Sequence, residues 1–148
     1  MARPSWWKRA FFLFWEAPQN ALGAATLAVH LLRGSAQRIT FADERVFVEL
    51  RGDGAVSLGL FVFFSRADNR YVPVGAENRD HEHGHSLQSR LLGPLYLPLV
   101  GIPSTMRVAY AIAYFHRHGG RWAHYYDAYP ERWADVLGGV DRTLRPPP

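Results

Sequence analysis

Two histidines stand one helical turn apart in the stretch Asp80-His81-Glu82-His83-Gly84-His85. On a helix, His81 and His85 share a face, so both imidazoles can bind one metal ion. Glu82 lies beside them and can act as a general base toward a water molecule. This is the His-Glu-x-x-His spacing of zinc hydrolases, and it predicts a zinc site with hydrolytic chemistry. His83 points away from that face, where it would meet solvent or support a ligand.

A third ligand must come from elsewhere, because a catalytic zinc ion usually takes three protein ligands and leaves one position for water. The best candidate is Glu131, in the segment Glu131-Arg132-Trp133-Ala134-Asp135. On a helix, Glu131 and Asp135 share a face, so one can bind metal while the other supports a histidine ring. Taken alone, Glu131 would be explained as an acidic residue that complements the helix dipole at an exposed helix start. Beside the first motif we assign it as the ligand, with Asp135 and Asp127 as alternatives.

Together, His81-Glu82-x-Gly84-His85 and Glu131-x-x-Ala134-Asp135 resemble the gluzincin branch of zinc metallopeptidases. The likeness is greatest to its minimal members and to CAAX-type membrane endopeptidases, whose second motif reads Glu-x-x-Ala-Asp. It covers these two motifs and not the full chain. The resemblance implies a zincin-like fold, zinc bound by His81, His85 and Glu131, water activated by Glu82, and Asp135 in support. The apolar, proline-rich segment after the first motif departs from that family.

The expected reaction is hydrolysis of a peptide bond, with a peptide or protein substrate bound along an exposed sheet edge. The oxyanion of the transition state needs a further hydrogen-bond donor. Candidates precede the second motif, and the sequence does not distinguish among them. They are Tyr125, Tyr126, Tyr129 and His124.

The alternative is a non-catalytic protein. In that case the chain would be a membrane-associated or scaffold module in which a structural zinc ion joins two helices, or which binds no metal. A structural zinc site is closed by a fourth protein ligand. His83, His124 or Asp127 would be the residue that closes it.

The composition of the chain limits the kinds of protein it can be. With 148 residues, 48% hydrophobic and 20% charged, the chain suits one folded domain. Its formal charge of +4 is spread along the chain, so we expect no nucleic-acid partner. Because there is no cysteine, any metal must be held by histidine and carboxylate. The composition leaves the oligomeric state open.

Residues 1–34 predict two N-terminal helices that could contact a membrane. Segments 11–32 and 91–106 are apolar but lack the ~20 uninterrupted apolar residues of a transmembrane helix. A cleaved signal peptide is not expected, because polar residues interrupt the apolar run. We therefore expect a cytoplasmic protein or a peripheral or monotopic membrane protein. The residues that suit a membrane interface are Trp6, Trp7, Trp15, Lys8 and Arg9.

The hydrophobic periodicity predicts an α+β fold in a single zincin-like domain, residues 1–148. Residues 38–65 alternate with a period of two and predict a three-stranded antiparallel meander. The turn residues Arg51-Gly52-Asp53-Gly54 predict a hairpin between its second and third strands. Residues 58–64 are apolar on both faces, so we expect them to be covered on both sides.

The motif helix is expected at residues 78–92. Asn78 or Asp80 could cap it, and Gly93-Pro94 should end it. Gly84 would let another backbone or a substrate come close to this helix.

The C-terminal part is expected to hold two more helices. Residues 95–103 contain several prolines and cannot form one regular helix. Ser104 should cap the helix that follows. The ligand helix is expected at 130–138, and the tail 142–148 should be extended or frayed.

Overall fold

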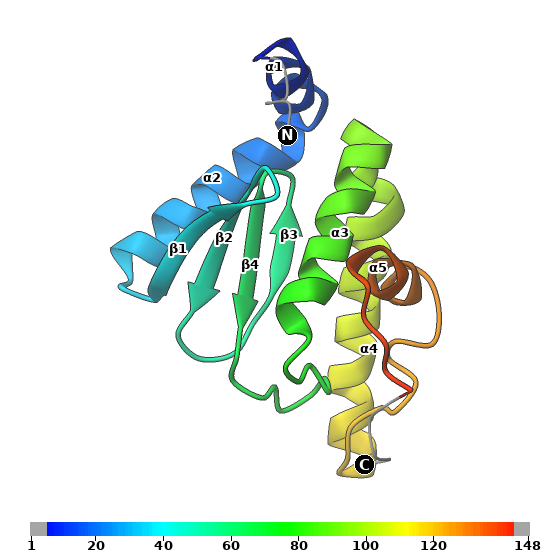
Figure 1. Cartoon of the computed structure of the whole chain (residues 1–148). Helices are drawn as coiled ribbons and strands as arrows, with labels where there is room; N and C mark the ends of the chain where they lie inside the picture. The colour runs from blue at the N-terminus through cyan, green and yellow to red at the C-terminus, as the bar shows by residue number, and fades with distance from the viewer. Residues whose placement is uncertain (1–5, 144–148) are drawn as a thin grey trace.

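A small β-sheet covered by helices forms the framework of the chain (Figure 1). The computed structural model describes residues 6–143 and has the α+β class that the sequence predicts. A 3-10 turn, η1 (Gly93–Leu95), and a π-helical segment, η2 (Leu97–Gly101), join α3 to α4. The helices and strands are α1 (Trp6–Trp15), α2 (Ala17–Leu32), β1 (Ala36–Ala42), β2 (Arg45–Leu50), β3 (Val56–Leu58), β4 (Phe61–Ser65), α3 (Asn78–Leu92), α4 (Ile102–His118) and α5 (Glu131–Gly138).

The sheet has four strands in the order β1-β2-β4-β3, and the prediction of three antiparallel strands was wrong. The outer pairs are antiparallel, but β4 runs parallel to β2. Residues 55–65 form two strands rather than one, because the chain reverses at Gly59, whose φ is +61°. The turn at 51–54 is therefore no hairpin. It leads to the edge strand β3, from which β4 returns to pair with β2.

Alternate side chains of the central strands face different helices. Val48 and Phe63 pack in a cluster with Leu27 of α2, whereas Phe47 contacts His83 of α3. α2 and α3 therefore cover opposite faces of the sheet (Figure 1). This covering agrees with the prediction for residues 58–64, since β4 is buried along nearly all of its length.

Helix α3, which carries the first motif, spans the predicted residues 78–92. The predicted N-caps, Asn78 or Asp80, were wrong, because Glu77 occupies that position, whereas the predicted end at Gly93 is confirmed. The Asn78 side chain instead donates a hydrogen bond to the Ser65 carbonyl at 2.8 Å. The start of α3 is thereby fixed to the end of β4.

Helix α5, which carries the second motif, packs directly on α3. A Cβ atom at Gly84 would overlap the carbonyl oxygen of Ala134, and one at Gly138 would overlap that of Asp80. Gly84 thus allows another backbone to come close, as its place in the first motif predicts. This contact puts the two motifs side by side.

The segment after α3 is helical but irregular, which agrees with the prediction that residues 95–103 form no regular helix. α4 begins at Ile102, so the predicted cap at Ser104 was wrong. Within residues 6–143, none of the helices is long and apolar enough to cross a bilayer.

Candidate metal centre

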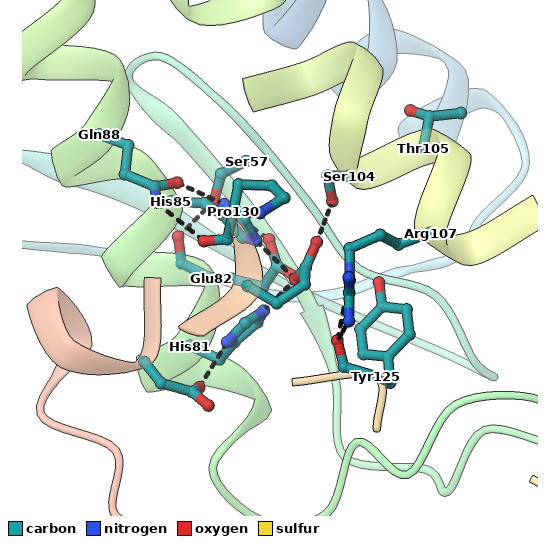
Figure 2. A network of polar contacts seen from close by, with 12 residues as sticks. Ser57, His81, Glu82, His85, Gln88, Ser104, Thr105, Arg107, Tyr125 and Pro130 are labelled. Atoms are coloured by element: carbon teal, nitrogen blue, oxygen red, sulfur yellow. Dashed lines mark hydrogen bonds and ion pairs between the residues drawn. The ribbon is translucent and has the colours of Figure 1, made fainter. Parts of the chain in front are cut away.

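Three buried side chains from α3 and α5 converge on one point (Figure 2). His81 Nε2 lies 3.0 Å, and His85 Nε2 3.1 Å, from the same oxygen, Oε2 of Glu131. The ligand atoms of the three residues all lie within 4.8 Å of one another. The spacing of four residues on α3 turns both imidazoles toward α5. The fold thus brings together the three side chains that the sequence assigns as metal ligands.

Each of these side chains makes a further hydrogen bond through the atom that does not face the shared point. Asp135 Oδ1 lies 2.7 Å from His81 Nδ1, and Gln88 Oε1 lies 2.7 Å from His85 Nδ1. Ser104 Oγ donates to the second carboxylate oxygen of Glu131, Oε1, at 2.6 Å. These bonds orient both rings so that their Nε2 atoms face the shared point.

Asp135, the predicted supporting residue, is itself held by an arginine. Arg142 donates to its two oxygens, with Nε 2.5 Å from Oδ2 and Nη2 2.8 Å from Oδ1. The guanidinium also covers the ring of Tyr126. The predicted frayed tail 142–148 therefore needs correction at Arg142, while residues 144–148 lie outside the described part of the chain.

Burial and the carboxylates act in opposite directions on the site's titratable groups. Burial lowers the pKa of His81, but hydrogen bonds to Asp135 and Glu131 outweigh it and raise that pKa to about 9. Burial tends to raise the pKa of Glu131, yet hydrogen bonds from His81 and His85 hold that pKa well below its usual range. The site therefore stabilises positive charge, and its nitrogen and oxygen donors fit a bound cation.

Glu82, the predicted general base, is buried in the wall of a cavity of about 420 Å³. His85 and Glu131 line the same cavity. The Ser57 hydroxyl, from β3, donates to the Glu82 carbonyl, and its Oγ also lies 3.2 Å from Oε2 of Glu82 (Figure 2). Burial raises the pKa of Glu82 above its ordinary value. A carboxyl group with a raised pKa is suited to accept and return a proton.

Two of the four candidate oxyanion donors, Tyr125 and Tyr126, are buried near the site. Tyr125 lines the cavity that holds Glu82. Arg107 fixes the backbone there by donating to the Tyr125 carbonyl at 3.0 Å (Figure 2). The ring of Tyr126 meets His81 edge to face, with centroids 5.0 Å apart, and does not line that cavity.

The other two candidates lie away from the cavity. Tyr129 donates its hydroxyl to the Leu99 carbonyl, and His124 forms an exposed pair with Asp127, with Nδ1 2.5 Å from Oδ2. Asp127, the alternative ligand, thus pairs with His124 and does not join His81 and His85. His83 contacts Phe47 of β2 and so packs on the sheet. Among residues 6–143, no fourth histidine, aspartate or glutamate joins the three-residue group.

The sequence reasoning missed three polar residues of the site: Ser57, Gln88 and Ser104. Gln88 follows His85 by three positions, so helical spacing could have placed it beside that ring. Ser104 lies inside α4, whose N-cap is Gly101, three residues before the predicted cap, and its hydroxyl donates to Glu131. Ser57 lies in an apolar strand, and no local pattern connects it with the motif helix.

Comparison of the chain with protein-family models, with curated proteins and with solved structures finds no match.

Proposed function

We propose that this protein is a zinc-dependent metallopeptidase with a zincin-like fold. The observation that carries the proposal is the convergence of two imidazole nitrogens and one carboxylate oxygen beside buried Glu82. Two histidines and a glutamate are a donor set of catalytic zinc sites. Three protein ligands leave a coordination position for water, which favours a catalytic over a structural ion.

His81, His85 and Glu131 would hold the zinc ion, which when bound lowers the pKa of a water molecule and polarises the scissile carbonyl. Glu82 accepts a proton from the attacking water as the new C–O bond forms. It then gives this proton to the amine nitrogen as the C–N bond breaks. The raised pKa of Glu82 suits this role, because the carboxyl group must hold the proton between the two steps.

Tyr125 is the best placed of the candidate donors to the negatively charged oxygen. It lines the cavity together with Glu82 and Glu131. Burial raises the pKa of Tyr125, so its hydroxyl stays protonated and remains a donor.

A peptide substrate would bind along β3, the edge strand beside the cavity. In the described sheet β3 pairs only with β4, so an added strand could pair with its outer edge beside Ser57, whose carbonyl already accepts from the Tyr96 hydroxyl at 3.0 Å. Residues 55–58 line the cavity, which brings such a strand next to Glu82. Leu97 and Met106 give the cavity an apolar wall that suits an apolar side chain of the substrate.

Glu82→Gln tests the proposal directly, because the amide keeps the shape of the side chain and cannot accept a proton. The zinc-loaded wild type should hydrolyse members of a peptide library, and Glu82→Gln should lose at least about a hundredfold in kcat/KM. Its zinc content, measured by atomic emission on tag-free protein, should stay at the wild-type level. Asp80→Asn, an exposed carboxylate of the same helix, is the matched control and should keep full activity.

Two results would reject the peptidase. One is zinc bound with equal affinity by wild type and Glu82→Gln while neither cleaves any peptide, which would favour a structural ion. The other is the absence of bound metal from tag-free wild-type protein dialysed against zinc.

A further inference from the structure

Helix α1 buries none of its ten residues. Its sequence, Trp-Trp-Lys-Arg-Ala-Phe-Phe-Leu-Phe-Trp, has Lys8 and Arg9 as its polar members. Trp6 is 81% exposed and Phe14 83% exposed, although both are large apolar side chains. A ten-residue helix is marginal in water by itself. This helix therefore lacks, within the described chain, the apolar surroundings that its side chains favour.

The apolar surface continues from α1 onto the segment after α3. The Trp15 ring packs on Gly93, and its Nε1 donates to the Arg90 carbonyl at 3.1 Å. Figure 1 shows α1 and the C-terminal end of α3 at the same end of the molecule. Exposed apolar side chains follow from there into η1, η2 and the start of α4. We call these residues, together with α1, the apolar end: Leu91, Leu95, Leu99, Ile102 and Met106.

Charge on the apolar end is basic. α1 has no acidic residue, and Lys8 and Arg9 lie between its tryptophans. Arg9 Nε lies 4.0 Å from Oε1 of Glu44, whose other oxygen is bound by Arg90 at 3.0 Å, so two arginines share this one carboxylate. Tryptophan beside lysine and arginine is the composition of helices that lie in a membrane interface with anionic lipid.

We propose that the apolar end docks on the surface of an anionic lipid bilayer, with α1 lying in the interface. Ten residues of helix are about 15 Å long, half the ~30 Å of a bilayer core, so α1 would lie along the surface and not cross it. Ile102 and Met106 belong both to the apolar end and to the cavity wall, so docking brings this part of the cavity wall to the lipid. The docking does not depend on the proposed hydrolysis.

Flotation with vesicles tests the proposal. Full-length protein is mixed with vesicles of phosphatidylcholine alone or of phosphatidylcholine with phosphatidylserine. Wild type should float with the mixed vesicles, and salt should weaken its binding. The double variant Trp6→Ser/Phe14→Ser should lose about a hundredfold in vesicle partitioning, because two large apolar side chains no longer enter the interface.

Leu32→Ser is the matched control, since Leu32 is 89% exposed but lies at the far end of α2 (Figure 1). It should bind vesicles like the wild type. Circular dichroism and zinc content identify variants that remain folded. Wild type that stays in solution with both kinds of vesicle would overturn the proposal. So would equal flotation of the double variant, or a wild-type dimer that the double variant converts to a monomer without any vesicle binding.

Discussion

Glu131 hydrogen-bonds both His81 and His85, whereas Asp135 hydrogen-bonds His81 alone and Asp127 neither of them. The loss of zinc affinity on substitution should therefore be largest at Glu131, smaller at Asp135 and absent at Asp127. Glu131→Gln should lose more zinc affinity than the ~10–100-fold expected for Asp135→Asn, which replaces the charged carboxylate that supports His81 with a neutral amide. Asp127→Asn, in an exposed pair, should bind zinc like the wild type. Competition with a chromogenic chelator measures all three. A loss in Asp127→Asn equal to that in Glu131→Gln would contradict the assignment.

The raised pKa of His81 predicts how the metal-free protein responds to pH. The folded value of about 9 exceeds the unfolded value of 6.5, so the protonated ring stabilises the fold. That stability is fully present below pH 6.5 and is lost as the pH rises through 9. Thermal melting in a chelator should therefore show Tm falling across this range.

Zinc should reverse this dependence, because the ion binds neutral imidazole and competes with the proton. Stabilisation by added zinc should therefore grow as the pH rises. Asp135→Asn serves as the control, since it replaces the charged hydrogen-bond acceptor that raises the pKa of His81 with a neutral one and should flatten the metal-free profile. A metal-free Tm that rises from pH 6.5 to 9 would contradict the prediction.

At the scale of single residues, residue types and short spacings were enough to select the candidate metal ligands. His81 and His85 are one turn apart on one helix, so their shared face follows from helical geometry alone. Ser57 and Ser104 differ, because each reaches the site only through contacts between segments distant in sequence. Such contacts are decided by packing, and no local pattern encodes them.

At the scale of the elements, the contact between α3 and α5 holds the two motifs together. In an ordinary helix interior, replacing glycine with alanine stabilises by up to about 1 kcal/mol. Gly84→Ala should do the opposite and destabilise by about 1–3 kcal/mol, because the methyl group would overlap the Ala134 backbone. Urea unfolding measures the change, and zinc affinity should fall as α5 moves away.

Gly120→Ala is the matched control, because a Cβ atom there meets no atom within 4 Å. Its free energy of unfolding should stay within about 0.5 kcal/mol of the wild type. A stabilised Gly84→Ala protein would show that α5 does not pack on α3 at this distance.

The sheet shows where prediction of elements from sequence fails. The apolar run of residues 58–64 correctly indicated burial on both faces, but an unbroken apolar run hides a turn. Gly59 supplies that turn, and a single glycine within a strand pattern equally suits a bulge. Strand order then depends on which edges meet, and β4 inserts between β2 and β3, two strands that follow one another in the sequence.

At the scale of the whole molecule, a buried ion pair joins three elements. Arg45 of β2 binds both oxygens of Glu16, at the α1–α2 junction, with distances of 3.0 Å and 3.3 Å. Arg45 also donates to the Ser86 carbonyl at 2.8 Å, and Ser89 donates to Glu16 at 2.6 Å. Both serines lie on α3. These hydrogen bonds thus connect the N-terminal helices, the sheet and the motif helix. No sequence motif predicted this connection.

Loss of one partner from this pair should destabilise the whole fold. Arg45 and Glu16 are each 1% exposed, so Arg45→Met would remove the hydrogen-bonded counter-charge of a buried carboxylate and leave only Arg90, whose Nε lies 3.9 Å from Glu16 Oε2. The expected loss is about 3–5 kcal/mol of unfolding free energy, measured in urea. Glu16→Gln/Arg45→Met should recover part of it, because no charge then remains unpaired.

Arg66→Met removes an arginine from a pair of similar distance, 2.9 Å, in which Arg66 is 74% exposed. Water already screens that charge, so its loss should cost no more than about 1 kcal/mol. The difference between the two single variants isolates the effect of burial. Equal losses in Arg45→Met and Arg66→Met would show that water reaches Glu16, and that packing of α2 and α3 on the sheet, rather than the ion pair, joins the N-terminal helices to the motif helix.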